Sequence, residues 1–412
     1  MFKKVAKNAL FLSSSQAFSR LIGLAYFVIL ARFLTVEKFG VYTFTLSFVY
    51  NFIPVADFGI ERLVLRDISR EPEKTAFFLS RLLPLRIILA TAAYSLILLL
   101  GLILKPSGPQ IIYLAIFGLA LFPYNLTFLL SSFLNAKEKM KYTAMVNLAL
   151  ILLTVLFGIT FVYFKLGLEM ILFSYPLANL ILAIILLRTS RKFGLSLGWT
   201  IDWEFWKRCL KESWVFATLT IIAVFYLRIS IVAINLLKGS VATGLYGTSF
   251  KFIEGLILIP QSLSLALFPV CARLSKVDLP KLKKVYFKGI FILFLLSLPI
   301  ALSFSLFAKT IITVPYGAKY LSASTTLPVF GLATILSFIN ALAGNIIQNS
   351  EKVKMYIPLF FSNFVFEIIL CLFLIPRWGI VGAAWSVVGG EVFALVINNL
   401  LVLNILRPAK QW

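Results

Sequence analysis

Long runs of apolar residues dominate the chain, and they are continuous rather than alternating. A helix needs about 20 mostly apolar residues to cross a bilayer, whereas the strands of a membrane β-barrel alternate apolar and polar positions. The pattern therefore predicts an all-α integral membrane protein with about 12 transmembrane helices. The predicted spans are residues 9–33, 40–61, 79–104, 110–134, 142–164, 167–187, 214–237, 243–271, 287–308, 324–348, 356–376 and 379–405.

Composition leads to the same class of protein. Of the 412 residues, 61% are hydrophobic and 13% are charged, whereas a soluble domain is roughly 45–50% apolar and about 25% charged. The chain has too few polar side chains to cover a water-facing surface, which excludes a soluble enzyme or a DNA-binding factor. The net charge of +23 is therefore interpreted as a topology signal, and no nucleic-acid partner is predicted.

The positions of Lys and Arg orient the spans. With the N-terminus inside, 27 of the 39 cations lie in cytoplasmic segments, 8 lie on the opposite side and 4 lie within spans. Because cytoplasmic loops are enriched in Lys and Arg, both termini are predicted to be cytoplasmic, in a multi-pass protein of the cell (plasma or inner) membrane. The first apolar run has no small-residue cleavage site, so it is predicted to be a retained span.

The two halves of the chain resemble each other. Gly40-Val41-Tyr42 follows the first predicted span, and Gly244-Leu245-Tyr246 follows the seventh. Six spans in each half predict parallel repeats, related by an axis along the membrane normal, and two such pseudo-symmetric six-helix bundles are typical of alternating-access carriers. The predicted division is residues 1–190 as an N-terminal six-helix lobe, residues 191–213 as an amphipathic cytoplasmic linker, and residues 214–412 as a C-terminal six-helix lobe.

Cations inside the spans are the candidate binding residues. A charge at mid-span costs roughly 2.5–3.5 kcal/mol on insertion scales and usually faces a polar interior. Arg20, Arg228 and Lys251 are predicted to form a cationic cavity for an anionic headgroup, because guanidinium groups bind phosphate oxygens bidentately. Gln16 shares a helix face with Arg20. Two alternatives remain: Lys251 and Glu254 form a structural i,i+3 pair, and Arg228 binds backbone carbonyls.

Four acids are candidates for ion coupling or gating: Asp57, Glu254, Glu367 and Glu391. Glu367 and Glu391 lie near mid-depth of the last two spans and have few cations nearby, which favours titration. Asp57 lies toward the cytoplasmic end of the second span. A gate contact from Asp57 to Arg62 or Arg66 is one interpretation, and an interfacial ion pair is the other.

Enzyme and metal chemistry have little support in the sequence. Histidine is absent, which removes the commonest general base and metal ligand, and the three cysteines form no CxxC pair. We predict no catalytic residue, metal site or cofactor, and we expect transport to use protons, sodium ions or the membrane potential. Arg86, near the cytoplasmic end of the third span, is expected to snorkel toward the surface.

Several motifs carry a family resemblance. Residues 31–42 read ARFLTVEKFGVY, and Asp57-Phe58-Gly59-Ile60 follows a span later. Together with Gly244-Leu245-Tyr246 and the segment 375–384 (IPRWGIVGAA), this order resembles polysaccharide-biosynthesis flippases of the multidrug/oligosaccharidyl-lipid/polysaccharide (MOP) superfamily, whose fold is MATE-like. Relatives often have Arg-Ile-Asp in the seventh span, where this chain has Arg228-Ile229-Ser230, so an ion-coupling role for that aspartate does not transfer.

The resemblance implies a flippase. Such a protein moves a polyprenyl-(pyro)phosphate-linked oligosaccharide from the cytoplasmic to the outer leaflet by alternating access, for cell-surface polysaccharide or glycoconjugate synthesis. The implied partners are this lipid-linked glycan, membrane lipids, and glycan polymerase or glycosyltransferase machinery. A multidrug or organic-cation antiporter of the same superfamily is the alternative, but it needs carboxylates at mid-depth of the N-terminal lobe, where spans 1 and 3 to 6 have none. A membrane glycan polymerase or ligase would need a sizeable outer loop.

Overall fold

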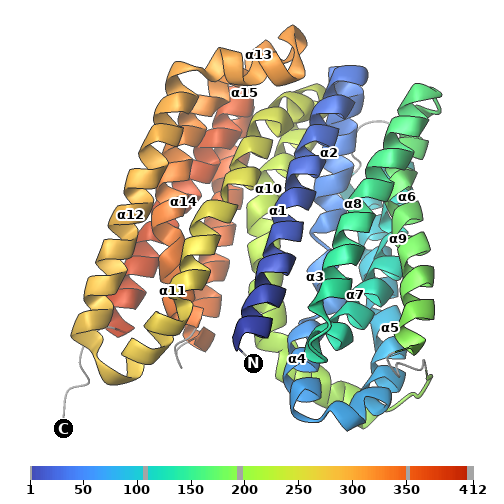
Figure 1. Cartoon of the computed structure of the whole chain (residues 1–412). Coiled ribbons are helices and arrows are strands. Elements are labelled where there is room, and N and C mark those ends of the chain that lie inside the picture. Colours follow the sequence, from blue (N-terminus) through green and yellow to red (C-terminus); the bar gives the residue numbers. More distant parts are fainter. Residues whose placement is uncertain (1, 105–109, 193–197, 349–352, 406–412) are drawn as a thin grey trace. The chain divides into compact units, whose positions relative to one another are not determined.

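Helices form wherever the sequence is continuously apolar. The computed structural model describes residues 2–104, 110–192, 198–348 and 353–405, and within these ranges it contains helices and no strand (Figure 1). A helix bonds its backbone N–H and C=O groups within its own segment, which lipid requires because no water is present to bond them. The prediction of an all-α membrane protein is confirmed.

Ten helical ranges in the described residues are long and apolar enough to cross a membrane. Two of them, Trp203–Ser264 and Tyr356–Ile405, have 62 and 50 residues, more than twice what a bilayer needs. Each contains one glycine with non-helical geometry: Gly239 has φ 80° and Gly379 has φ 55°. These glycines divide the two ranges, so the ten ranges supply the twelve predicted spans.

Side-chain contacts show that the helix containing Gly379 folds back on itself. The rings of Phe366 and Phe393 stack with centroids 4.7 Å apart, and the Cys371 sulfur lies 3.1 Å from the Ser386 hydroxyl. Residues that lie 27 and 15 positions apart in the chain could not touch along one straight helix, which rises 1.5 Å per residue. Gly379 is therefore the turn of a helical hairpin.

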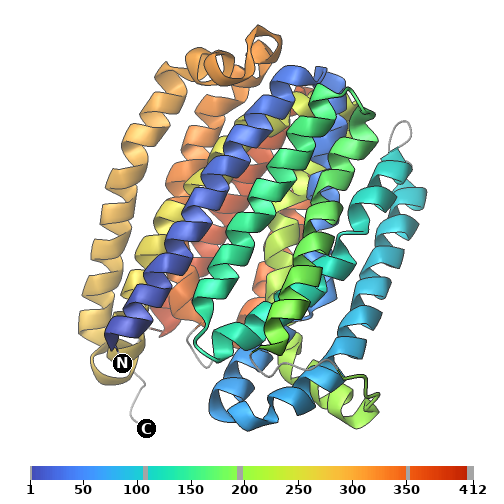
Figure 2. The same ribbon diagram turned by 45° about the vertical axis from the view of Figure 1, so that its right-hand side comes forward.

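Contacts divide the chain into two compact units. Unit 1 comprises Met1–Leu34 and Val41–Arg228. Within it α1, α8 and α9 lie side by side, as Figure 2 shows in blue and green. Its helices are α1 (Phe2–Phe33), most of α2 (Val36–Tyr50), α3 (Ile53–Asp57), α4 (Ile60–Arg70), η1 (Pro72–Lys74), α5 (Thr75–Leu104), α6 (Gln110–Gly118), α7 (Leu121–Ala136), α8 (Met140–Tyr163), α9 (Gly167–Arg191) and the first part of α10 (Trp203–Leu256).

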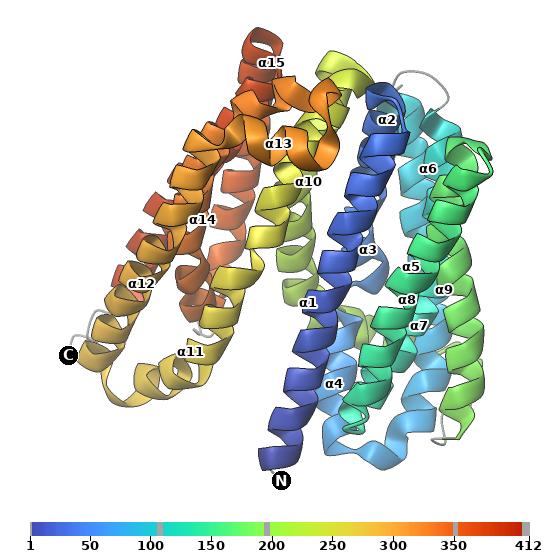
Figure 3. The same ribbon diagram turned by 45° about the horizontal axis from the view of Figure 1, so that its top comes forward.

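Unit 2 comprises Thr35–Gly40 and Ile229–Trp412. In it α12 packs along α14, and α13 crosses the end of this pair (Figure 3). The helices of unit 2 are the end of α10, α11 (Leu258–Val277), α12 (Leu279–Leu306), α13 (Ala308–Tyr316), η2 (Ala318–Thr326), α14 (Leu327–Gln348) and α15 (Val353–Ile405). The division between the units falls inside α10, whereas the sequence places a linker at residues 191–213; that three-part division stays a prediction.

The start of α10 explains why part of this helix groups with unit 1. Asp202 caps the helix by accepting the Phe205 backbone N–H at 3.0 Å, and the helix then runs without interruption into the next span. Trp206 is buried and donates its indole N–H to the Arg81 carbonyl at 2.7 Å, whereas Trp203 is exposed. The described part of the predicted linker is therefore continuous with a span and packs on α5; residues 193–197 lie outside the described residues.

The repeated glycines of the sequence meet within unit 2. A Cβ on Gly40 would lie 1.7 Å from the Ser240 carbonyl oxygen, and a Cβ on Gly244 would lie 2.3 Å from the Val36 carbonyl oxygen. Backbones that approach this closely leave no room for a side chain. The two glycines are therefore required by the crossing of α2 with the second part of α10.

Candidate functional site

Arg228 lies on an aromatic surface of unit 1. Its guanidinium carbon is 5.2 Å from the centre of the Tyr50 ring, which is within the range of a cation–π interaction. Tyr50 in turn contacts Phe117 and Tyr175, at centroid distances of 5.8 and 5.9 Å. Helix α2 thus places the Tyr50 ring beside a half-buried cation of the seventh span, and α6 and α9 supply the two rings that pack on Tyr50.

Arg20 and Gln16 lie on one exposed face of α1, while Ser15 points into unit 1 and is buried. The shared face follows from their i,i+4 spacing. An exposed arginine in the middle of a span requires polar surroundings, because burying it in lipid is unfavourable. The binding roles assigned to Arg20 and Gln16 stay predictions.

The prediction for Arg86 is wrong. It is 1% exposed, one of its terminal nitrogens lies 2.5 Å from Asp57 Oδ1, and the other donates to Asn125 Oδ1 at 2.8 Å. Its guanidinium also lies over the Phe128 ring, 5.7 Å from the centroid. The Asp57 carboxylate and the Asn125 amide bind the guanidinium inside unit 1, so the side chain does not need to extend to the surface to reach polar groups.

Asp57 therefore pairs with Arg86 and not with Arg62 or Arg66. Its other carboxylate oxygen accepts the Gly59 backbone N–H at 3.0 Å. Between α3 and α4, Phe58 and Gly59 both have positive φ, 51° and 72°, which interrupts the second span. The buried ion pair thus lies at a break in the helix, between α3 and α5.

In unit 2, Lys251 and Glu254 form an ion pair of 2.6 Å. Both residues lie on α10, and the contact follows from their i,i+3 spacing. The pair neutralises Lys251 locally, so this lysine offers an anion less net charge than an unpaired lysine would. The binding roles assigned to Lys251 and Glu254 stay predictions.

A second buried carboxylate lies in unit 2. Glu367 is 1% exposed, and its Oε2 atom has no hydrogen-bond partner among the described residues. Both amide atoms of buried Asn363, one turn earlier on α15, also have no partner there. Glu391 is close enough to interact electrostatically with Glu367, and its own carboxylate accepts the Asn340 amide N–H at 2.7 Å.

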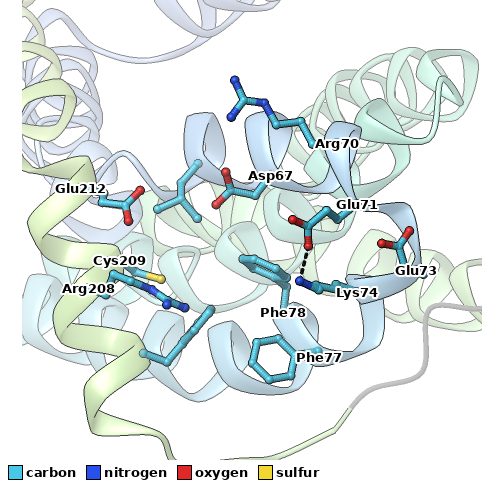
Figure 4. Close-up of a pocket in the computed structure, with 12 residues that line it drawn as sticks. Asp67, Arg70, Glu71, Glu73, Lys74, Phe77, Phe78, Arg208, Cys209 and Glu212 are labelled. Atoms are coloured by element: carbon cyan, nitrogen blue, oxygen red, sulfur yellow. Dashed lines mark ion pairs between the residues drawn. The ribbon is translucent and has the colours of Figure 1, made fainter.

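A further cavity lies elsewhere in unit 1. It has a volume of about 630 Å³ and is formed by α4, η1, the start of α5 and the start of α10. Figure 4 shows Arg208, Cys209 and Glu212 on one wall and Glu71 and Lys74 on the other. Lys74 pairs with Glu71. This cavity therefore carries both signs of charge.

Ion pairs at the ends of these helices set the local titration. Arg81 Nε donates to Asp202 at 2.8 Å, and this bond lowers the pKa of Asp202. The Glu71 carboxylate beside Lys74 raises the pKa of that lysine. Across the described residues, no group of three Asp, Glu or Cys side chains could hold a metal ion.

With this geometry in view, the family can be assigned. Residues 5–275 match the family described as "Polysaccharide biosynthesis protein". The chain belongs to this family. Residues 216–373 also match the MatE family, which agrees with the MOP-superfamily resemblance of the motifs.

Among curated proteins, an uncharacterized membrane protein of Methanocaldococcus jannaschii is 27% identical over 159 residues. The match covers 38% of this chain and 29% of that protein. The chain thus spans less than a third of the length of the curated relative that it matches.

Three solved membrane transporters have folds similar to that of this chain. A multidrug resistance MATE family transporter in an inward-facing conformation has a TM-score of 0.77 at 12% identity, covering 94% of both chains. The lipid II flippase MurJ has a TM-score of 0.76 at 16% identity, covering 96% of this chain and 87% of that one. A MOP superfamily transporter from Pyrococcus furiosus, described as having a binding pocket of reverse polarity, has a TM-score of 0.66 at 12% identity, covering 98% and 95%. These likenesses give the chain a MATE-like fold.

The polar centre around Arg86 was missed at the sequence level, although a signal was present. Asn125 lies in the fourth span, where an amide is unusual and typically bonds between helices. An arginine, an aspartate and an asparagine on three predicted spans could have been grouped by depth. The Tyr50, Phe117 and Tyr175 contacts carried no such signal, because aromatic residues are frequent in every span.

Proposed function

We propose that this protein is a flippase for a polyprenyl-(pyro)phosphate-linked oligosaccharide. It moves the lipid-linked glycan from the cytoplasmic to the outer leaflet by alternating access, for cell-surface polysaccharide or glycoconjugate synthesis. The proposal rests on the membership of the chain in the polysaccharide biosynthesis family, together with the arginine at mid-span of α1 and of α10. A glycan polymerase or glycosyltransferase would act before or after this step as a partner.

In this proposal Arg20 and Arg228 bind the (pyro)phosphate, and Lys251 is a weaker third cation because Glu254 pairs with it. Guanidinium groups bind two phosphate oxygens at once, and they stay charged at any physiological pH. Gln16, one turn from Arg20, supplies an amide donor on the same face. The isoprenoid tail stays in lipid while the polar part crosses beside these residues.

Ion coupling is proposed for Glu367. A buried carboxylate needs a proton or a cation, and the unpartnered oxygen of Glu367 together with the unpartnered amide of Asn363 could bind either. Glu391 interacts with the same carboxylate. Asp57 is assigned a gating role through its bond to Arg86 at the α3–α4 break.

The test is translocation in proteoliposomes with a fluorescent polyprenyl-diphosphate sugar, followed by its accessibility to a quencher outside the vesicle. We expect wild type to move the probe, and Arg20→Ala/Arg228→Ala to lose most of the activity while keeping its expression and its thermal unfolding midpoint. Arg32→Ala/Lys238→Ala is the matched control, because it removes one cation from each of the same two helices outside the mid-span region. Full activity in the Arg20→Ala/Arg228→Ala variant would refute the anion site, and efflux of an organic cation without lipid movement would favour the antiporter.

A further inference from the structure

The cavity between α4, η1, α5 and the start of α10 is large enough for a ligand. Its volume of about 630 Å³ lies within the usual range of ligand sites, about 300–1,000 Å³. The side chains of Leu63, Phe78, Phe205 and Cys209 in its wall are buried, and most of the charged side chains around them are exposed. We call it the α4–α10 cavity.

Two carboxylates of the α4–α10 cavity are held by one guanidinium. Arg66 Nε lies 2.6 Å from Asp67 Oδ1, and a terminal nitrogen of Arg66 pairs with Glu212. Asp67 and Glu212 both line the cavity (Figure 4), and their shared partner keeps the two carboxylates near one another. Because a carboxylate has about four lone-pair sites, both groups can accept further N–H donors from a ligand.

Arg208 supplies a cation in the same cavity. Its guanidinium carbon lies 5.5 Å from the centre of the Phe205 ring, and it forms no ion pair with any of the described residues. Glu212, one turn further along α10, is already paired with Arg66. A guanidinium binds phosphate oxygens through two parallel N–H bonds, so Arg208 offers a site for a phosphate.

Exposed tryptophans place the cavity at the level of lipid headgroups. Trp199 and Trp203 are 62% and 73% exposed, and Trp203 lies within two turns of Arg208 on α10. The Thr200 backbone N–H donates to the Ser80 carbonyl at 3.0 Å, which fixes this segment beside α5. Tryptophan is enriched where the membrane meets water, so a lipid of the surrounding leaflet can reach the cavity with its headgroup.

The charges around the cavity balance. Four cations face four carboxylates: Arg66, Arg70, Lys74 and Arg208, and Asp67, Glu71, Glu73 and Glu212. A ligand with a net negative charge would gain from the cations but be repelled by the carboxylates. A zwitterion, which carries one charge of each sign, matches both.

We propose that the α4–α10 cavity binds the headgroup of a phosphatidylethanolamine lipid, with the phosphate on Arg208 and the ammonium between Asp67 and Glu212. Arg208 and Glu212 are four residues apart, about 6 Å along the helix axis, and the two carbon atoms between phosphate and ammonium let one headgroup reach both. The bound lipid joins α4 to the start of α10. This site is independent of the proposed transport function.

Native mass spectrometry of the delipidated protein in detergent measures binding of three lipids with the same acyl chains: phosphatidylethanolamine, phosphatidylcholine and phosphatidylglycerol. We expect phosphatidylethanolamine to bind most tightly, because the choline ammonium has no N–H to donate and glycerol has no positive charge. Arg208→Gln should weaken phosphatidylethanolamine about 2- to 5-fold, as expected for one partly exposed charge pair. Lys207→Gln is the matched control, because it removes an exposed cation of the same helix that does not line the cavity.

Glu212→Gln tests the ammonium position through lipid selectivity, which a general loss of structure would not alter. It should weaken phosphatidylethanolamine and leave phosphatidylglycerol unchanged or tighter, whereas Glu204→Gln, an exposed acid of α10 outside the cavity, should change neither. If Arg208→Gln fails to fold, Arg208→Lys keeps the charge but loses the bidentate contact, and it should weaken phosphatidylethanolamine to a smaller extent.

Equal wild-type affinity for phosphatidylethanolamine and phosphatidylglycerol would overturn the proposed site, as would equal weakening by Arg208→Gln and Lys207→Gln. Soluble phosphoethanolamine is added as a competitor to identify the source of the headgroup. We expect it to bind far more weakly than the lipid, because it lacks acyl chains that contact the apolar surface of the spans. Binding as tight as that of the lipid would show that the ligand is a free phosphate ester and would overturn the lipid site.

Discussion

At the scale of single residues, two arginines of similar sequence context have different environments. Arg86 is enclosed by a carboxylate, an amide and a ring, whereas Arg228 lies half-buried on a tyrosine ring. The Arg86 charge is held inside the fold by a carboxylate and an amide of its own unit, whereas Arg228 makes a cation–π contact with Tyr50. The contacts of a charged residue therefore decide its role more than its depth in the span.

Removing the Arg86 side chain should strongly destabilise unit 1. Arg86→Ala leaves Asp57 without its cation, and breaking a buried pair in this way costs about 3–5 kcal/mol of the free energy of unfolding. Denaturant unfolding in detergent, followed by tryptophan fluorescence, measures the loss. Arg81→Ala is the control, since Arg81 lies on the same helix but its pair with Asp202 is partly exposed. Equal losses in the two variants would contradict a special role for the buried pair.

The bond between Arg81 and Asp202 should make the start of α10 sensitive to acid. Arg81 lowers the pKa of Asp202, so the folded state holds this carboxylate ionised more strongly than the unfolded chain does. The stabilisation is present above the ordinary aspartate pKa of about 3.9 and is lost as the pH falls through the lower folded value. The thermal unfolding midpoint of wild type should therefore drop further than that of Asp202→Asn between pH 6 and pH 3. Parallel curves would show that the bond adds no stability.

At the scale of elements, the sequence predicted the helices well and their interruptions less well. Apolar run length identified all twelve spans, because burial in lipid leaves the backbone no alternative to a helix. The break at Phe58 and Gly59 depends on a bond from Asp57 to the backbone, and the start of α10 at Trp203 depends on Asp202, which accepts the Phe205 backbone N–H. Both are tertiary or capping effects that apolar run length does not encode.

The crossing of α2 with α10 gives an element-scale prediction. Gly40→Ala would place its Cβ 1.7 Å from the Ser240 carbonyl oxygen, so the two helices must separate, at a cost of about 1–3 kcal/mol, as for other overpacked contacts. We expect a lower thermal unfolding midpoint in detergent. Gly255→Ala is the matched control, because a Cβ added there would meet no other helix of the described residues within 4 Å and alanine favours a helix. A midpoint that falls equally in both variants would mean that the close crossing is not the cause.

At the scale of the whole molecule, the helical membrane architecture was predictable from the sequence, and the binding residues stay predictions. Mid-span charges pointed to Arg20 and Arg228, and spacing pointed to the Lys251–Glu254 contact. The partners of Arg86 could not be assigned from spacing, because they lie on helices that are neighbours only after folding.

The orientation of the termini rests on the Lys and Arg distribution, and fluorescence from a green fluorescent protein fused to the C-terminus should show it to be cytoplasmic. A fusion that is well expressed but not fluorescent would contradict the predicted cytoplasmic C-terminus.

The transport cycle should respond separately to the membrane potential and to an ion gradient. An anionic substrate moving outward from an inside-negative compartment gains about 2.3 kcal/mol per charge per 100 mV, which is roughly a 50-fold shift in its distribution for one charge. If Glu367 binds the coupling ion, a proton or sodium gradient should shift that distribution further in wild type. Glu367→Gln, which keeps the size of the buried side chain but removes its charge, should lose the response to the gradient and keep the response to a valinomycin-imposed potassium potential. Both responses are measured with the fluorescent lipid probe in proteoliposomes. An unchanged gradient response in Glu367→Gln would exclude Glu367 as the coupling site. Loss of both responses would show that the glutamate is needed for the helix movements themselves.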